Sequence, residues 1–451
     1  MNLVKYILDN INHGNSRSVA VKKNIIGSFL LKGISIIVSF LLVPATIGYV
    51  DAELYGVWLT LSSMMIWLGF ADIGFTQGLK NKLTEAIAQN NWKRGKALVS
   101  TTYAMMFLIF LPVCIILEFI VPLVNWTSLL NVNPIYENEI LRVMHVLVAF
   151  ACLQMIVNVM VSVVAAFQKV ALSSSFLVIG NILSLINIYL LRAFFAPSLF
   201  SLVFAVSAMP ILVTILATFI LFNGRFKRVS PSWKTVDKFL IKDLFSLGYK
   251  FFIINIQVLV LYQSTNILIS YVSSPIDVTH YNIAYKLLNT AMMAYMIITS
   301  PLWPAYTDAY TREDYEWMKS VRKKMVRILM LSIFGCLILA ILSDPIYHLW
   351  IGNSVSIPGK MTFAVFIYVV IYCWMNLNAT FVAGVGKLQL HTIVSIFGML
   401  SHIFLSLVLS KYLGCYGVLI SLIIINVVYA CIYHVQVNMI LNRTVYGIWN
   451  K

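Results

Sequence analysis

The sequence predicts an all-α polytopic membrane protein with about 12 transmembrane helices, and three observations support this fold class. Of its 451 residues, 61% are hydrophobic and only 11% are charged, against about 25% charged residues in a soluble domain. Long stretches without any charge recur along the whole chain. Basic residues gather in alternate connections between those stretches. A soluble enzyme and a secreted disulfide scaffold are both excluded, the latter because the six cysteines are scattered.

Twelve of the charge-free stretches are long and apolar enough to cross a bilayer, which takes about 20 residues. A thirteenth, residues 119–136, contains two prolines and three asparagines and is predicted to be a loop. The twelve predicted spans are 33–50 (extended back to about Asn24), 54–71, 97–117, 143–168, 170–191, 193–224, 251–276, 287–307, 328–343, 361–386, 388–410 and 412–442.

The basic residues predict the orientation of these spans. With the N-terminus in the cytoplasm, 25 of the 32 Lys and Arg residues fall in cytoplasmic segments, and only Arg192, Lys360 and Lys411 fall on the opposite side. This bias predicts that both termini are cytoplasmic. It also explains the net charge of +16 without nucleic acid as a partner, because these loops face anionic lipid headgroups.

Two similar loops suggest that the chain consists of two halves. Thr84-Glu85-Ala86 is followed by a tryptophan and a basic residue, and Thr307-Asp308-Ala309, half a chain length later, is followed by the same pair. A parallel repeat of this kind places the substrate between the halves. The predicted organisation is an amphipathic cytoplasmic segment 1–22, an N-lobe 23–222 with spans 1–6, a basic inter-lobe loop 223–243, a C-lobe 244–442 with spans 7–12, and a cytoplasmic tail 443–451.

A lysine is predicted within the first span of each half. Lys32 lies about 12 Å beyond Asn24 along the helix, on a stripe of serines, and Lys250 begins a polar stripe that continues with Gln257. A charge at mid-bilayer costs at least about 2.5–3.5 kcal/mol, so it normally faces a wet cavity or a partner. Both stripes are therefore predicted to line one central cavity. The alternative for each lysine is snorkelling or an ion pair.

Two further bases are predicted near the same cavity. Lys286 in span 8 is accompanied by Tyr281, Tyr285 and Asn289, whose hydroxyl and amide groups suit sugar hydroxyls, and Arg142 lies near the outer start of span 4. For any single polar residue, hydrogen bonding between helices is the simpler interpretation. An excess of embedded bases favours an anionic substrate.

Two acids, Asp72 near the cytoplasmic end of span 2 and Glu118 at the outer end of span 3, are open to more than one interpretation. Asp72 is positioned to cap a helix or to pair with Lys32, and Glu118 is positioned to pair with Arg142. Ion coupling is the alternative for both. No phosphate-binding loop and no clustered metal ligands occur in the sequence. Neither a cofactor nor a metal is therefore expected, and an ion gradient is the candidate driving force.

The N-terminal part of the sequence resembles a known family over about residues 22–105. The matching residues are Leu31-Lys32-Gly33, Pro44, Tyr55-Gly56-Val57-Trp58, Asp72-Ile73-Gly74, Gly78 and Asn81. They are similar to those of bacterial O-antigen and polysaccharide flippases, the polysaccharide branch of the multidrug/oligosaccharidyl-lipid/polysaccharide exporter superfamily. The layout of twelve spans in two lobes extends the resemblance over the whole chain.

The resemblance implies a fold and a function. The fold is a MATE-like V-shaped pair of six-helix bundles in the bacterial inner membrane. The function is movement of an undecaprenyl-diphosphate-linked oligosaccharide, a repeat unit of O-antigen in lipopolysaccharide, of capsule or of exopolysaccharide, by alternating access. Family members carry cavity bases on spans 1, 4, 7 and 8, which Lys32, Arg142, Lys250 and Lys286 match by span. Other polysaccharide assembly proteins are possible partners.

Two other functions stay open at this point. A multidrug antiporter of the same superfamily would favour acids in its cavity, because its substrates are cationic. A membrane-embedded polysaccharide polymerase or ligase would be expected to carry a large outward loop, and the longest predicted outward loops, about 125–137 and 344–360, are short.

Overall fold

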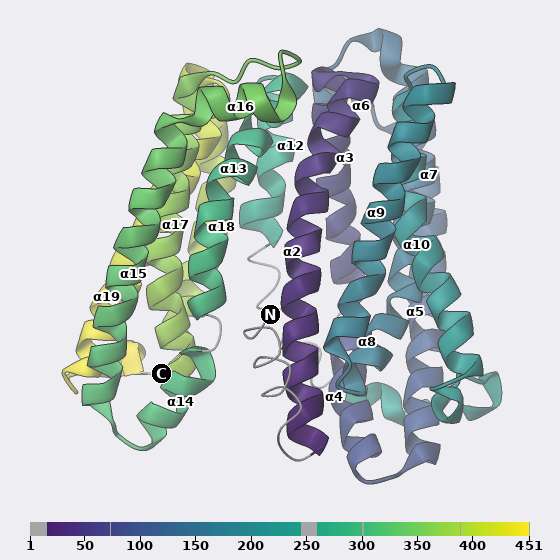
Figure 1. Ribbon diagram of the computed structural model, residues 1–451, viewed down its shortest axis with the longest axis vertical. Helices are drawn as coiled ribbons and strands as arrows, with labels where there is room; N and C mark the ends of the chain where they lie inside the picture. The colour runs from purple at the N-terminus through teal and green to yellow at the C-terminus, as the bar shows by residue number, and fades with distance from the viewer. Residues whose placement is uncertain (1–15, 73, 245–258, 300–301, 388, 451) are drawn as a thin grey trace, which may run out of the picture. The chain divides into compact units, whose positions relative to one another are not determined.

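The computed structural model describes residues 16–72, 74–244, 259–299, 302–387 and 389–450 (Figure 1). Within these residues every regular element is helical and no strand forms, which confirms the predicted all-α class. The contacts divide the chain into two compact units. The first comprises Met1–Asp51, Met64–Thr127 and Asn133–Ile256, and the second comprises Ala52–Ser63, Ser128–Val132 and Gln257–Lys451.

The first unit is built from long helices that bury apolar side chains against one another. Its core includes Leu79, Met106 and Phe110, all fully buried. Residues 52–63 of α3 pack with the second unit, which the sequence did not indicate. The helices are α2 Ser16–Val50, the end of α3 Ala52–Leu68, α4 Phe75–Ala88, α5 Trp92–Ile120, α7 Glu137–Val157, α8 Val159–Ala166, α9 Val170–Phe194 and α10 Leu199–Asn223.

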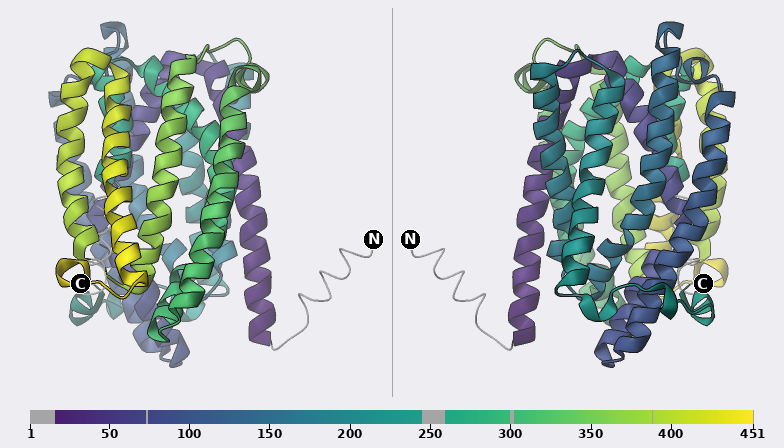
Figure 2. Two further views of the ribbon diagram at one scale, coloured as in Figure 1. Left: turned by 90° about the vertical axis from the view of Figure 1, so that its left-hand side faces the viewer. Right: turned by 90° about the vertical axis from the view of Figure 1, so that its right-hand side faces the viewer.

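The second unit has its own core around buried tyrosines, among them Tyr306, Tyr429 and Tyr433. In the left view of Figure 2, α17 lies between α15 and α19, and it contacts both. The helices are α12 Ser264–Val272, preceded by the π-helical turn η6 Leu259–Gln263, then α13 Pro275–Thr299, α14 Leu302–Thr311, α15 Tyr315–Ile341, α16 Ser343–Ile351, α17 Gly359–Val385, α18 Gln389–Leu413 and α19 Cys415–Leu441.

The predicted spans correspond to helices throughout the described residues. Nine helices there are long and apolar enough to cross a bilayer, and the other three predicted spans coincide at least in part with α3, α12 and α13. Residues 121–136 form only short helical turns, among them α6 Trp126–Leu130, as the prolines and asparagines predicted, whereas Phe119 and Ile120 complete α5. The predicted amphipathic helix near the N-terminus falls mostly on residues 1–15, which lie outside the described residues.

The eighth predicted span is displaced. The sequence placed it at 287–307, whereas α13 begins at Pro275 and ends at Thr299. The difference arises because an uncharged stretch can begin only after Lys286, which α13 carries near its middle. Proline suits the first turn of a helix, since its missing N–H has no partner there, and Asp277 in the same turn complements the helix dipole.

The two similar loops share one backbone geometry. Between α4 and α5, Asn90 has a φ of +54°, and Asn91 Oδ1 accepts a hydrogen bond of 3.0 Å from the backbone N–H three residues on. Between α14 and α15, Glu313 has a φ of +57°, and Asp314 Oδ1 accepts the equivalent bond, also of 3.0 Å. The two pairs are separated by the same interval as Thr84 and Thr307. In both loops, a residue with left-handed backbone conformation is followed by a residue whose side chain caps the start of the next helix.

An arginine stacks on the aromatic residue of each loop, although the two arginines are 215 residues apart and the two aromatic residues 223. The Arg228 guanidinium carbon lies 5.2 Å from the ring centre of Trp92, and that of Arg443 lies 4.4 Å from the ring centre of Tyr315. Trp92 and Tyr315 directly follow the two capping residues, and each arginine comes shortly after the last long helix of its unit. This matched geometry favours the internal duplication that the sequence indicated, whereas the boundaries of the lobes stay predictions.

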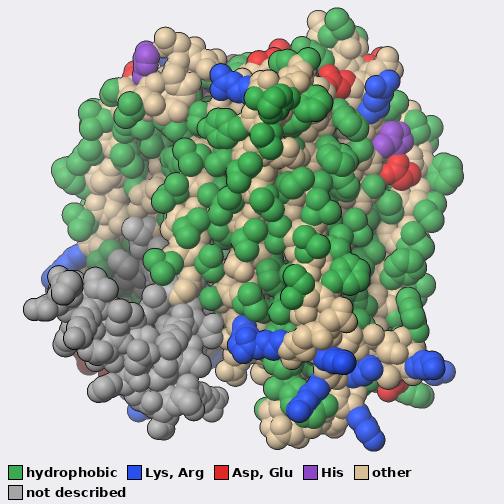
Figure 3. Space-filling model, turned by 45° about the vertical axis from the view of Figure 1, so that its right-hand side comes forward, with side chains coloured by type: hydrophobic (Ala, Val, Ile, Leu, Met, Phe, Trp, Pro, Cys, Tyr) green, Lys and Arg blue, Asp and Glu red, His purple; other side chains and the backbone are tan. Residues whose placement is uncertain are grey.

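The exterior is that of a membrane protein. On the face in Figure 3, hydrophobic side chains cover the middle, and Lys and Arg gather at the lower end. Exposed apolar side chains of the long helices include Leu108 at 65%, Phe119 at 73% and Phe219 at 65%. An apolar surface of this extent is typical of contact with lipid. The cytoplasmic location of both termini stays a prediction.

Candidate functional site

Lys32 lies near the middle of α2, almost equally far from Ser16 and from Val50. With a rise of about 1.5 Å for each residue, either end of the helix is roughly 25 Å away. The side chain is exposed, and no described carboxylate forms an ion pair with it. Lys32 thus lies within the helix, close to the start of its apolar part Leu30–Val50, and its role in binding stays a prediction.

Asp72, the last residue of the short helix η1 Gly69–Asp72, caps the helix that follows. Its Oδ1 accepts a hydrogen bond of 3.1 Å from the backbone N–H of Thr76, and its Oδ2 accepts one of 2.5 Å from Thr76 Oγ1. Gly74 supplies the φ of +81° that this turn requires. Within the described residues Asp72 forms no ion pair with Lys32. The geometry therefore favours helix capping over the pair that the sequence left open.

Substitutions at Asp72 are expected to separate capping from ion coupling. Asn accepts the same hydrogen bonds and Ala does not, so Asp72→Ala should lower the free energy of unfolding by about 1 kcal/mol and Asp72→Asn by much less. Thermal denaturation of the purified variants measures both. We expect Asp72→Asn to transport like the parent. Loss of transport by Asp72→Asn at unchanged abundance and stability would assign the carboxylate to ion coupling instead.

Glu118 contacts His145 rather than Arg142. Its Oε2 is within hydrogen-bond distance of His145 Nδ1, one helical turn beyond Arg142 on α7. Arg142 is exposed and forms no ion pair within the described residues. The C-terminal end of α5 therefore lies beside His145, one turn further along α7 than Arg142. The sequence could not resolve this difference of one turn. Arg142 lies in the second turn of α7, consistent with the predicted outer end of that span.

Lys286 lies close to the midpoint of α13. Its side chain is half-buried. Tyr281, Tyr285 and Asn289 follow one another at intervals of four residues and so share one face of the helix. The rings of Tyr281 and Tyr285 are stacked, with centroids 5.8 Å apart. The structure thus brings together four of the predicted residues on one helix, and their role toward a substrate stays a prediction.

The tyrosines of α13 continue into an aromatic chain that the sequence analysis did not identify. Tyr285 lies 6.1 Å from Tyr368 of α17, Tyr368 lies 6.2 Å from Tyr372, and Tyr372 lies 5.4 Å from Tyr262 of η6, measured between ring centroids. The available signal was the repeated spacing of two tyrosines by four residues, in α13 and again in α17. Tyr281 and Tyr368 are buried, at 6% and 3% exposed, whereas Tyr285, Tyr372 and Tyr262 are half-buried and have apolar ring faces with a hydroxyl group at the edge.

Two predicted cavity residues, Lys250 and Gln257, lie outside the described residues. Their placement on a polar stripe of the seventh span rests on sequence spacing alone. Their roles stay predictions.

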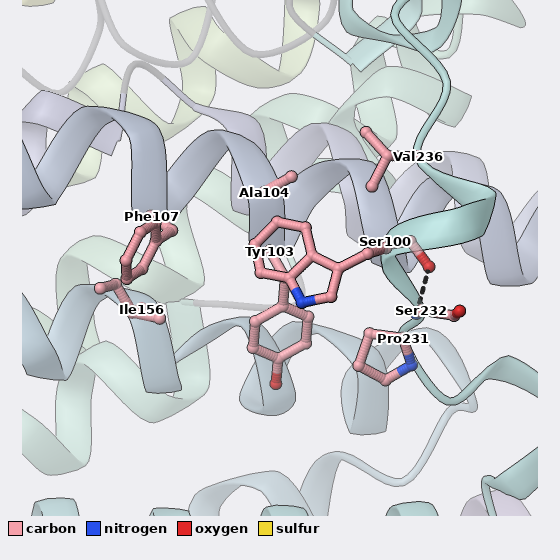
Figure 4. Close-up of a pocket in the computed structure, with 9 residues that line it drawn as sticks. Ser100, Tyr103, Ala104, Phe107, Ile156, Pro231, Ser232 and Val236 are labelled. Atoms are coloured by element: carbon pink, nitrogen blue, oxygen red, sulfur yellow. Dashed lines mark hydrogen bonds between the residues drawn. The ribbon is translucent and has the colours of Figure 1, made fainter.

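A pocket of about 250 Å³ in the first unit lies apart from the predicted site (Figure 4). Its walls come mainly from α5 and from the basic inter-lobe loop, and Tyr103 and Phe107 are among its residues. The backbone N–H of Ser232 donates a hydrogen bond of 3.0 Å to Ser100 Oγ, which ties the loop to α5. None of the predicted substrate-binding residues lines this pocket. It shows how the loop is held rather than where a substrate binds.

Solved structures share the fold of this chain. An inward-facing multidrug resistance MATE family transporter of the MOP superfamily matches with a TM-score of 0.71 at 15% identity, covering 91% of this chain and 98% of that one. An outward-facing form of a MATE family transporter matches with a TM-score of 0.64 at 15% identity, covering 95% and 97%. A MOP superfamily transporter from Pyrococcus furiosus, described by a reverse polarity of its binding pocket, matches with a TM-score of 0.62 at 15% identity, covering 95% and 97%.

These likenesses confirm the predicted MATE-like fold. A search of curated proteins finds no match. The family model for polysaccharide biosynthesis proteins matches residues 21–310, which include the motifs around Lys32, Gly56 and Asp72. The chain is therefore a multi-pass membrane protein with a transporter fold, and it belongs to the polysaccharide biosynthesis protein family.

Proposed function

We propose that this protein is a flippase that moves an undecaprenyl-diphosphate-linked oligosaccharide across the bacterial inner membrane by alternating access. The family supports a role in polysaccharide synthesis, and the fold supports membrane transport. The substrate class is the part that we infer from the residues.

One observation carries the inference: bases and acids occupy different positions along the helices. Lys32 and Lys286 lie near the middles of α2 and α13. In contrast, every carboxylate of the described residues lies in a loop or within four residues of a helix end. A diphosphate carries at least one negative charge on each phosphate, and an ammonium group attracts it strongly where the dielectric is reduced. Mid-helix lysines therefore favour an anionic headgroup.

The same observation weighs against a multidrug antiporter, which the fold fits equally well. Cationic substrates would be stabilised by carboxylates at mid-helix depth. The two acids that the sequence places near the ends of spans are engaged elsewhere, since Asp72 caps α4 and Glu118 contacts His145. A polymerase or ligase is disfavoured because the connections between the helices are short. The longest connection predicted to face outward consists of α16 and the residues up to Gly359.

The oligosaccharide is proposed to lie against polar and aromatic groups of the second unit. Tyr285 and Asn289 share one face of α13 and are half-buried, and Tyr372 is a half-buried member of the neighbouring aromatic chain. Ring faces pack against the apolar faces of sugars, and hydroxyl and amide groups bond to sugar hydroxyls. No cofactor is proposed. An ion gradient is the proposed energy source, and other polysaccharide assembly proteins are the proposed partners.

Reconstitution tests the proposed substrate directly. We expect proteoliposomes with the purified protein to translocate a fluorescent undecaprenyl-diphosphate-linked oligosaccharide, measured as the fraction of sugar that an added lectin reaches. Empty liposomes are the control. Ethidium, a cationic dye, should not be transported by the same proteoliposomes. Transport of ethidium without movement of the lipid-linked sugar would overturn the proposal in favour of the antiporter.

A further inference from the structure

A polar cluster in the second unit contains none of the proposed substrate residues. Arg322, two turns into α15, is half-buried. Its guanidinium donates hydrogen bonds of 2.6 Å to Asn438 Oδ1 and of 3.3 Å to Asn378 Oδ1, and it lies 3.1 Å from His434 Nδ1. The cluster joins α15, α17 and α19, which run side by side in Figure 2.

The charge of Arg322 is not neutralised by these contacts. Its partners are two neutral amides and an imidazole nitrogen that accepts, and no carboxylate of the described residues forms an ion pair with it. A guanidinium has five N–H donors, of which these contacts use three. Removing a charge from water without a counter-charge is unfavourable. The cluster is therefore electrostatically complementary to an anion, with donors left to bind it.

An apolar groove of about 280 Å³ leads away from the guanidinium between α15 and α17. Val326 and Met330 line it from α15 and are 41% and 61% exposed, and Trp374 lines it from α17. Its far residue on α15, Ile333, lies three turns beyond Arg322, a distance of roughly 16 Å along the helix. Exposed apolar side chains on a membrane helix face lipid. The groove thus has the length and polarity for a hydrocarbon chain with its charged end at Arg322.

We propose that this groove is a binding site for one anionic phospholipid of the surrounding bilayer. The phosphate accepts hydrogen bonds from Arg322, and one acyl chain lies along Val326, Met330 and Trp374. The lipid belongs to the leaflet in which α15 begins, which the basic residues predict to be the cytoplasmic one. The site goes beyond the proposed transport function, because the lipid is a bound component and not the substrate.

Native mass spectrometry of the delipidated protein with added phosphatidylglycerol tests the headgroup contact. We expect one tightly bound phosphatidylglycerol, and Arg322→Gln should weaken its apparent affinity about tenfold or more, because charge-assisted hydrogen bonds are lost. The matched control is Lys323→Gln, which removes the same charge from the next, exposed residue. This variant should change the affinity less than twofold. Phosphatidylethanolamine should bind the parent weakly.

A second pair of variants tests the groove and does not depend on the folding of Arg322→Gln. Val326→Trp fills the groove and leaves the polar cluster intact, so it should also weaken phosphatidylglycerol binding about tenfold. Its control is Leu331→Trp, at a side chain that is 71% exposed and does not line the groove. The control should bind like the parent.

The outcomes decide the proposal. The proposal is supported if Val326→Trp weakens phosphatidylglycerol binding and Leu331→Trp does not, and if Arg322→Gln weakens binding more than Lys323→Gln does. Equal losses in Arg322→Gln and Lys323→Gln would indicate diffuse attraction to basic residues and overturn it. Unchanged binding by Val326→Trp would overturn it as well, as would binding of soluble glycerol phosphate with the affinity of the whole lipid.

Discussion

Replacing Lys286 by glutamine is expected to abolish export of the polysaccharide while leaving the amount of protein in the membrane unchanged. Glutamine keeps polarity and most of the length but removes the charge. If the ammonium group attracts the diphosphate, its loss should lower transport at least about tenfold. Lys286→Arg should retain part of the activity, since the charge survives with the geometry of a planar fork. Transport of the labelled lipid-linked oligosaccharide in proteoliposomes measures the effect.

The matched control is Lys360→Gln, which removes a lysine from the second position of α17 rather than from mid-helix. It should transport like the parent. Parental transport by Lys286→Gln would remove the main support for an anionic substrate. If abundance instead falls in the Ala, Arg and Gln variants alike, Lys286 is a structural partner within the second unit.

The same three substitutions at Lys32 and Lys250 are expected to follow the same order. Lys250 is the stronger case from the sequence, because its polar stripe continues at intervals of seven residues through Gln257. Transport that depends on Lys286 but not on either of these lysines would restrict the anion site to the eighth span.

Replacing Gly56 by alanine is expected to prevent stable folding, whereas the same change at Gly33 is not. A Cβ atom on Gly56 would lie 1.8 Å from the carbonyl oxygen of Pro275 and 2.9 Å from Thr279 Oγ1. The nearer atom belongs to the backbone at the start of α13 and cannot rotate away. Overpacking costs about 1–3 kcal/mol where side chains adjust, so we expect a loss of about 3 kcal/mol or more here.

Gly33 in α2 provides the control, because it is also a helical glycine of the N-terminal family motif. A Cβ atom there would meet nothing within 4 Å, and alanine favours a helix over glycine by up to about 1 kcal/mol. Gly33→Ala should therefore raise the melting temperature slightly or leave it unchanged. Thermal scanning of both purified variants, with size-exclusion profiles, makes the comparison. A Gly56→Ala protein that melts with the parent would contradict the close approach of α3 to α13.

The pattern of apolar runs and charges is enough to predict that the chain is helical and embedded in a membrane. These properties follow from local quantities, namely the length of apolar runs and the places where prolines, asparagines and charges interrupt them. Such runs must satisfy their own backbone hydrogen bonds in lipid, so they form helices wherever they are long enough. The duplicated loops were also visible, because a helix cap depends on a few neighbouring residues such as Asn91 and Asp314.

Which side chains meet depends on how the helices pack. Glu118 contacts His145 instead of Arg142, and Asp72 bonds to Thr76 instead of Lys32. Helical periodicity gives the face of a residue but not its depth against another helix, and a shift of one turn exchanges one partner for another. The start of α13 differs from the predicted start of span 8 for a related reason. Packing against neighbouring helices allows α13 to carry Lys286 near its middle, whereas a stretch without charges can begin only after Lys286.

Arg322 and the aromatic chain through Tyr368 illustrate the same limit. In the sequence Arg322 is one of several bases near the start of a span, and nothing local separates it from Lys323. Its amide and imidazole partners come from α17 and α19, which are distant in the chain. Tyr285 and Tyr368 likewise become neighbours only when α13 packs on α17. Contacts between distant segments depend on how whole helices pack, and the local pattern of one helix does not contain that information.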